Sequence, residues 1–382
     1  MMDKLKKIRW NHYINYIVIG IFTLVFSIIS LVGGHLNSSV LFLFEKIAIS
    51  VILALSLSLV VGFLGELSLG HAGFMCVGAY LGGKLSAVLE PVIGNSVLNL
   101  IVSLILGAAV AAVCGVIIGI PALRLRGDYL AIVTLAFGEI VKSIFQNTSA
   151  ESFGGALGLP TPRFDKQYLF IWAFLLVLLT LAVIQNFIRS KHGRAVTAIR
   201  DNEIAARATG INVTKYKLLA FTLSAAFAGI AGVLYSFSNY NVQSAKFGYN
   251  YSIEILVMVV LGGMGSINGS IIAAALITFL NTKLATILTG DLAVLQNFFY
   301  AVILILIVVY NNAPALKNFR DKYNFSALLG KIVRRKNDPS SITDDKAKWD
   351  VVPTKIEMNE VLSIDMVPQD KKYEQNGRGD RK

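Results

Sequence analysis

Long apolar runs, separated by short polar segments, make up most of the chain as far as residue 312. The runs have about the 20 residues that a helix needs to cross the ~30 Å hydrocarbon core of a bilayer. They are continuous and do not alternate between apolar and polar positions, which argues against a membrane β-barrel. We therefore predict an all-α polytopic membrane protein with about ten transmembrane helices. The expected spans are residues 13–32, 47–64, a third run that ends near residue 89, 97–120, 129–145, 168–188, 216–237, 253–261, 271–287 and 295–310.

The composition changes abruptly after residue 312. The segment 313–382 mixes charged and polar residues and shows little apolar periodicity. A segment of this kind cannot bury enough apolar surface to offset the entropy that folding costs. We predict a transmembrane domain over residues 1–312 and a disordered cytoplasmic tail over residues 313–382.

Composition and charge narrow the class further. Charged residues are 15% of the 382 residues and hydrophobic residues 55%, whereas a soluble domain carries roughly a quarter charged residues. The net charge of +12 is spread over short loops and the tail, so membrane topology explains it better than nucleic-acid binding. With a cytoplasmic N-terminus, the positive-inside rule places the basic loops near Arg124 and between residues 189 and 215 in the cytoplasm, with both termini. Cys76 and Cys114 lack metal-ligand spacing, so we predict no metal site and no disulfide framework.

One strongly polar segment lies between the sixth and seventh apolar runs. Asp201 can N-cap a short helix there, and Gly210 can end it in a left-handed conformation. Arg200, Glu203 and Arg207 stand at ion-pair spacing. A helix of little more than two turns is marginal by itself in water. We expect this helix to dock on a soluble partner through an apolar face made of Ile204, Ala205 and Ala208.

Two glycine-rich segments interrupt the apolar runs. Residues 65–73 carry three glycines together with Glu66, Ser68 and His71, and residues 262–269 carry Gly262 and Gly265. Unpaired polar groups are costly against lipid, so these segments must be buried in protein, line water or lie at the surface. They are either part of a translocation pathway or gate, or turns that connect helices near the cytoplasmic interface.

Glu139 and Lys142 stand three residues apart inside the fifth expected span. This spacing lets the two side chains pair on one helix face. Ionisable residues at such depth indicate function by default, and the pair could meet a zwitterionic solute. An ion pair with a purely structural role would show the same residues at the same spacing.

A source of energy is absent from the chain itself. Residues 78–85 approach a phosphate-binding loop, but Leu85 stands where a Ser or Thr that holds Mg²⁺ belongs, and the stretch lies in an apolar helix without a preceding strand. No catalytic constellation accompanies it. We therefore predict a protein that is not an enzyme and does not hydrolyse ATP alone.

Five stretches resemble, in order, the permease subunits of bacterial branched-chain amino acid ABC importers, and the M-type permease in particular. They are Gly65–Phe74, Arg124–Ile140, Gly193–Ala206, Gly210–Phe221 and Gly262–Ser266, and the resemblance covers residues from about 15 to 310. It implies a subunit of the inner membrane that passes branched-chain amino acids inward. The implied partners are a second, H-type permease, two ATPase subunits and an extracytoplasmic substrate-binding protein. No cofactor is expected on this chain, since ATP and Mg²⁺ would bind to the ATPases.

The resemblance also implies site residues. The loop before the seventh span would grip the ATPase, with the coupling residues Arg194, Asp201, Glu203, Ala205, Ala206, Arg207 and Gly210. This resembles the Glu-Ala-Ala…Gly pattern of ABC importers, although Ile204 here separates Glu203 from the alanines. The outer loop with Gly154, Gly155 and Gly158 resembles the surface on which the binding protein docks.

Other functions remain open on the sequence. Sister permeases that resemble these carry urea or other amides. A proton-coupled secondary transporter would use Glu66, His71 and Glu139 as a relay. A passive channel or a membrane scaffold would depend on neither energy source.

Overall fold

The computed structural model describes residues 16, 19–26, 37–93, 96–125, 127–162, 164, 166–287, 301–302 and 305. The chain divides into two compact units, Met1–Val309 and Tyr310–Lys382. The second unit, and with it the tail predicted over 313–382 and its boundary, lies outside the described residues. The tenth expected span lies almost wholly outside them and the first in part.

Nearly all described elements are helices. The long ones are α2 (Ser38–Ser58), continued by the π-helix η3 (Leu59–Leu64), α3 (His71–Ile93), α4 (Ser96–Ala122), α5 (Asp128–Asn147), α7 (Lys166–Arg189), α10 (Val213–Asn239) and α12 (Ile267–Ile287). The short ones are α6 (Ala150–Phe153), η4 (Gly155–Leu157), α8 (Lys191–Asp201), α9 (Glu203–Ala208), η5 (Ser244–Phe247) and α11 (Tyr249–Gly262).

The described helices confirm an all-α polytopic membrane protein but not ten spans. Six of them are long and apolar enough to cross a bilayer, and these six match the second, third, fourth, sixth, seventh and ninth expected spans. The fifth expected span corresponds to α5, which is not among the six. The eighth corresponds to α11, whose 14 residues extend only about 21 Å at 1.5 Å per residue.

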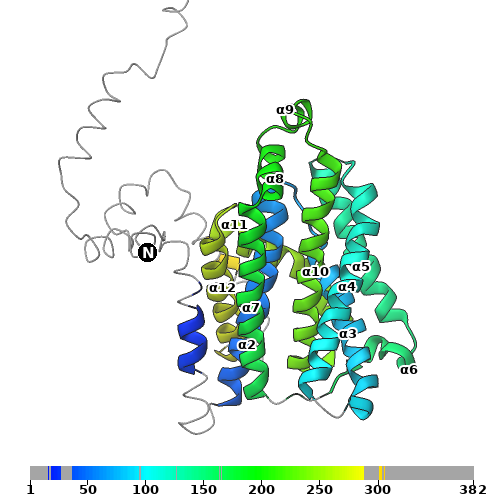
Figure 1. Ribbon diagram of the computed structural model, residues 1–382. Helices are drawn as coiled ribbons and strands as arrows, with labels where there is room; N and C mark the ends of the chain where they lie inside the picture. The colour runs from blue at the N-terminus through cyan, green and yellow to red at the C-terminus, as the bar shows by residue number, and fades with distance from the viewer. Residues whose placement is uncertain are drawn as a thin grey trace, which may run out of the picture. The chain divides into compact units, whose positions relative to one another are not determined.

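Helices α3, α4 and α10 form one half of the bundle, with α10 beside the other two (Figure 1). Glycines bring α3 and α10 into backbone contact. A Cβ added at Gly78 would lie 2.3 Å from the carbonyl oxygen of Gly229, and one added at Gly232 would lie 2.1 Å from that of Met75. The small residues therefore serve close helix packing, which supplies much of the association energy between helices in lipid.

Helix α2 is the centre of the other half. Its residues from Ala48 to Ser58 are all buried, and α7, α11 and α12 pack around it together with α10. Part of the first expected span is helical in residues 19–26, where the ring of Phe22 lies 5.4 Å from that of Phe44 on α2 and 5.3 Å from that of Phe174 on α7. α2 thus has protein on all sides along most of its length.

A two-residue ribbon joins the two long loops at one end of the bundle. Strand β1 (Leu159–Pro160) pairs antiparallel with β2 (Asn241–Val242). The Tyr80 hydroxyl donates to the carbonyl oxygen of Val242 at 2.9 Å and fixes the ribbon on α3. The loop after α5 is therefore tied to the loop after α10, although more than 80 residues separate them in sequence.

We predict that the α3–α10 contact limits stability. Gly78→Ala places a methyl group against the Gly229 backbone, and overpacking of this kind costs about 1–3 kcal/mol. The matched control is Gly138→Ala on α5, whose added Cβ would meet nothing closer than 3.8 Å. Thermal unfolding of the purified protein in detergent should show a lower melting temperature for the first variant only. Equal melting temperatures would contradict the close contact.

Candidate functional site

Two short helices, α8 and α9, project from one end of the bundle between α7 and α10, and we call residues Lys191–Ala208 the elbow (Figure 1). Ser190 caps α8 by accepting hydrogen bonds from the backbone N–H groups of His192 and Gly193. Asn202 breaks the helix with an extended backbone and caps α9 through the N–H of Ala205 at 3.0 Å. The prediction that Asp201 caps the docking helix is therefore wrong, because Asp201 ends α8 and Asn202 follows it in the cap position.

The exposed face of α9 is apolar, as predicted. Ile204 is 75% exposed, and Ala205 and Ala208 are exposed beside it, whereas Ala206 is buried. Gly210 ends the turn with a φ of 85°, and the N–H of Ile211 bonds back to the carbonyl of Ala206. Exposed apolar side chains at the tip of a short helix favour a docked partner.

Of the ion pairs predicted in the elbow, one forms and one does not. Glu203 and Arg207 form the predicted ion pair at 2.9 Å. Arg200 does not pair with Glu203 but with its neighbour Asp201, also at 2.9 Å. Arg194 is exposed and donates to the carbonyl oxygen of Arg189 at 3.2 Å.

A buried lysine connects the elbow with the membrane-embedded core. Lys217, in the second turn of α10, is only 3% exposed. Its Nζ donates to Glu203 Oε2 at 3.2 Å and to Glu66 Oε1 in the glycine-rich segment after η3. A buried cation is stable only with such partners, and removal of one member leaves a buried charge without its counter-charge. We call Glu66, Glu203 and Lys217 the ion cluster.

Arg200 makes a second connection. Its Nη1 donates to the carbonyl oxygen of Gly62 in η3 at 3.0 Å. Gly65, at a φ of 79°, leaves room for the Arg200 side chain, since an added Cβ would lie 2.7 Å from its Cγ. A Cβ at Gly62 would lie 2.5 Å from the backbone nitrogen of Gly265. The segment 262–269 thus meets the end of η3, directly before the segment 65–73, beside the elbow.

His71 lies in a polar cluster of the core and not in a relay. It is 1% exposed, and its Nε2 is 3.1 Å from the hydroxyl oxygens of both Ser56 on α2 and Ser224 on α10. Ser68 is fully buried nearby in sequence, in the segment that precedes α3. Among the described residues, no hydrogen bond or ion pair joins His71 to Glu66 or Glu139. The geometry therefore offers no direct path for a proton along these three side chains.

Glu139 and Lys142 pair as predicted, at 3.0 Å. Glu139 Oε1 also accepts the backbone N–H of Tyr249, the first residue of α11, at 2.7 Å. The carboxylate thereby satisfies an otherwise free N–H group at the start of a helix and complements its dipole. The pair positions α11, which favours the structural role over direct contact with a solute.

Helix α11 is discontinuous with α10. The backbone between them turns through η5, where Ser244 and Phe247 are buried, and α11 begins only at the level of Glu139 in the interior of α5. Non-helical backbone at membrane depth is tolerated where protein buries it or where it lines a cavity. In transporters, broken helices of this kind surround the solute site.

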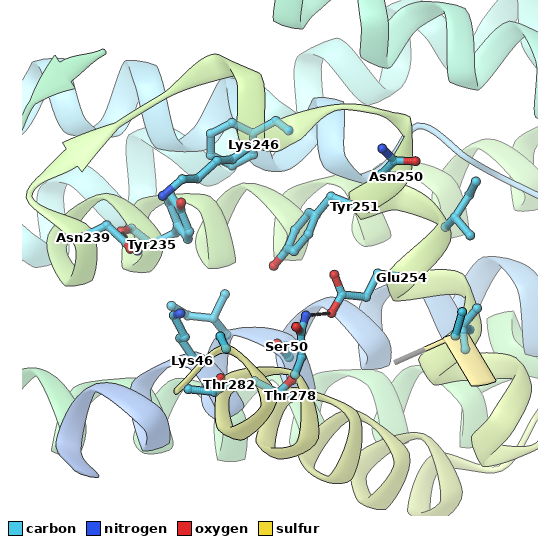
Figure 2. Close-up of a pocket in the computed structure, with 17 residues that line it drawn as sticks. Lys46, Ser50, Tyr235, Asn239, Lys246, Asn250, Tyr251, Glu254, Thr278 and Thr282 are labelled. Carbon is cyan, nitrogen blue, oxygen red and sulfur yellow. Dashed lines mark hydrogen bonds between the residues drawn. The ribbon is translucent and has the colours of Figure 1, made fainter. Parts of the chain in front are cut away.

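A cavity of about 880 Å³ opens beside η5 and α11 (Figure 2). Residues of α2, α10, η5, α11 and α12 line it, together with Ala301. Its polar lining consists of Lys46, Ser50, Tyr235, Asn239, Lys246, Asn250, Tyr251, Glu254, Thr278, Asn281 and Thr282. The predicted pathway or gate residues Glu66, Ser68, His71, Glu139, Lys142, Gly262 and Gly265 are all outside this lining.

Sequence reasoning missed this cavity and the ion cluster. Glu254 is the sole charged residue of the eighth expected span, which is the pattern that indicates a functional ionisable residue in a membrane. Lys217, near the start of the seventh run, has the same pattern. Lys46 follows Glu45 directly before the second expected span and shows no such pattern. Their partners lie on other helices, so only the fold shows which residues meet.

The glycine-rich loop after α5 has an exposed tip that the prediction did not name. Gly154, Gly155 and Gly158 are themselves buried, and all three have positive φ values. They shape a tight turn that leaves Leu157 80% exposed. If this loop meets a partner, the contact is made by the tip and not by the glycines.

Comparison with known proteins identifies the family. The model of the branched-chain amino acid transport system / permease component family matches residues 39–309. The high-affinity branched-chain amino acid transport system permease protein LivM of Salmonella typhimurium is 40% identical over 261 residues, which is 60% of each chain. The aligned region therefore spans less than two thirds of that relative.

Two further relatives show the breadth of the similarity. The ribose import permease protein RbsC of Escherichia coli K12 is 28% identical over 289 residues, covering 70% of this chain and 84% of its own. The probable branched-chain amino acid transport permease protein LivH of Methanocaldococcus jannaschii is 31% identical over 142 residues, covering 37% of this chain and 44% of its own. No solved structure gives a significant match. Because the family model matches more than half of its residues, this chain belongs to the permease components of branched-chain amino acid transport systems.

Proposed function

We propose that the chain is the permease subunit of an ATP-binding cassette importer that carries branched-chain amino acids across the bacterial inner membrane. The observation that carries the proposal is the elbow, whose exposed apolar tip is joined to the core by the buried ion cluster. Together with the family and the LivM relative, this supports a subunit that receives force from outside the membrane. ATP and Mg²⁺ bind to separate ATPase subunits, and this chain binds no cofactor.

The assembly consists of this chain, a second permease, two ATPase subunits and an extracytoplasmic binding protein. The similarity to both LivM and LivH relatives supports a pair of related permeases. The elbow carries several basic residues, and the positive-inside rule puts it in the cytoplasm, where the ATPases are. Both termini lie on that side.

In this mechanism, closure of the ATPase pair displaces α9. Lys217 and Arg200 pass the displacement to α10 and η3, because they bond the elbow to these elements. Helices α10 and α3 are in backbone contact through glycines, so they move as one body. The loaded and empty ATPases must bind α9 with different affinities, since a partner without differential affinity shifts no equilibrium.

The substrate and energy source can be tested in proteoliposomes that contain the two permeases, the two ATPases and the binding protein. We expect concentrative uptake of L-leucine, L-isoleucine and L-valine that requires ATP and survives collapse of the proton gradient. Uptake of urea or ribose instead would refute the assigned substrates. Uptake that follows the proton gradient without ATP would refute the energy source.

The tip of α9 should be needed for ATPase binding. Ile204→Glu introduces a charge into the docked apolar face, and we expect the ATPase subunits to be lost on co-purification while the protein still inserts. Leu157→Glu, an equally drastic change of an exposed side chain in a loop distant from the elbow, is the matched control and should retain them. Retention of the ATPases by the first variant would place the contact elsewhere.

Removal of the Lys217 side-chain charge should uncouple leucine uptake from ATP hydrolysis. Lys217→Met leaves Glu66 without its cation and Glu203 with only the exposed Arg207, and breaking a buried ion pair in this way costs about 3–5 kcal/mol. We expect leucine uptake per ATP hydrolysed to fall by about tenfold or more. Lys215→Met, two residues earlier and exposed, is the control.

A triple variant separates charge from shape in this test. Lys217→Met combined with Glu66→Gln and Glu203→Gln also removes the two carboxylate charges, so it should recover folding stability but not coupling. Unchanged uptake per ATP in Lys217→Met would exclude the ion cluster from force transmission.

A further inference from the structure

We propose that the cavity beside α11 binds the zwitterionic form of an aliphatic amino acid, so that this subunit itself holds the solute during passage. The inference rests on the proposed function and adds to it a site within one permease. The volume of about 880 Å³ lies within the range of about 300–1,000 Å³ usual for small-molecule sites.

The charges of the lining are arranged for a zwitterion. Lys46 of α2 and Lys246 of η5 supply two cations, and Glu254 of α11 supplies an anion. Figure 2 shows the lysine side chains toward one end of the cavity and the Glu254 carboxylate toward the other, with the Tyr251 hydroxyl pointing into the space between. The α-carboxylate of an amino acid would meet the lysines, and its α-ammonium would meet Glu254.

Lys46 and Glu254 act on each other only across the cavity and not in a direct ion pair. No salt bridge within the described part of the chain joins Lys46 or Lys246 to Glu254. Both charges have a close contact with a neutral group: Glu254 Oε1 accepts a hydrogen bond from the Asn281 amide at 2.9 Å, and Lys46 Nζ lies 4.6 Å from the centre of the Phe42 ring. Charges held apart in a partly buried site are costly, and a solute with both charges supplies the missing counter-charges.

The rest of the lining fits an aliphatic side chain. Ile49, Phe247, Ile253, Val257 and Ala285 give the cavity an apolar wall. A binding site with an apolar wall and a few placed polar groups selects an amphipathic ligand. Ribose and urea carry neither charge and would leave Glu254 and the lysines without charged partners. A site built to pair with polar groups binds an analogue that lacks them much more weakly.

The backbone around the cavity also has the form of a solute site. Helix α11 starts midway along α5, held there by Glu139, and three of its residues from Asn250 to Glu254 are polar or aromatic groups of the lining. Discontinuous helices at membrane depth place both backbone dipoles and side chains around a solute. The short length of α11 therefore follows from its place at the cavity.

Direct binding tests the inference. Radiolabelled L-leucine is titrated to about 10 mM against the purified assembly of permeases and ATPases without the binding protein. We expect saturable binding that L-valine displaces. 4-Methylpentanoate, which lacks the ammonium, isopentylamine, which lacks the carboxylate, and ribose should displace it poorly. Absence of saturable binding, or equal displacement by the singly charged analogues, would overturn the inference.

Variants locate the site. Glu254→Gln and Lys46→Met should each weaken leucine binding by about tenfold or more, because each removes a side-chain charge that faces an opposite charge of the solute. Glu90→Gln on α3 and Lys283→Met on α12 remove the same charges outside the lining and should bind leucine as the parent does. Glu254→Asp keeps the charge and should recover part of the affinity. Binding unaffected by Glu254→Gln and Lys46→Met would place the leucine elsewhere and refute the inference.

Transport separates this inference from the proposed function. ATPase activity stimulated by the loaded binding protein shows that each variant is assembled. If the parent imports leucine and Glu254→Gln imports it with the same KM and kcat, the site is refuted and the function stands. If the parent imports no amino acid, the function fails. We expect the parent to import leucine and Glu254→Gln to raise KM or lower kcat while stimulated ATP hydrolysis persists.

Discussion

The structure depends on one constraint, that polar groups removed from water must find partners within the protein. Lys217 meets it with two carboxylates on different elements, and Glu139 meets it by joining Lys142 and the first N–H of α11. Each of these contacts brings together parts of the chain that are far apart in sequence. The partners of the buried Lys217 therefore hold the elbow on the core, and those of the half-buried Glu139 set the level along α5 at which α11 begins.

Helix α10 connects the two candidate sites. Its early residue Lys217 belongs to the ion cluster, and its late residues Tyr235 and Asn239 line the cavity. Twenty-seven residues of helix measure about 40 Å, so one rigid element reaches from one site to the other. Glycine contacts with α3 leave little room for α10 to bend or slide alone. A displacement of the elbow would therefore be transmitted along α10 to the cavity.

Features set by local sequence could be predicted. The apolar runs gave the helices, the spacing of Glu139 and Lys142 gave their pair, and Gly210 gave the end of α9. The cap of α9 was misplaced by one residue, because Asp201 and Asn202 are both good capping residues and only the backbone conformation decides between them.

Features set by long-range contact could not be predicted. The cavity needs α2 beside α11, and Lys46 and Glu254 are separated by more than 200 residues. Periodicity indicates that a helix has neighbours but not which ones, so the sequence alone does not bring these two ionisable residues together. The same holds for Lys217, whose two carboxylates come from before α3 and from α9.

The ribbon of β1 and β2 links the loop after α5 to the lining of the cavity. Val242 is paired with Leu159 and sits only four positions before Lys246, which lines the cavity. A partner that displaced the nearby exposed Leu157 would move Lys246 through the hydrogen-bonded backbone of the ribbon, without tilting a long helix. A binding protein docked on this loop and an ATPase pair closing on the elbow would then act on the same cavity through different elements.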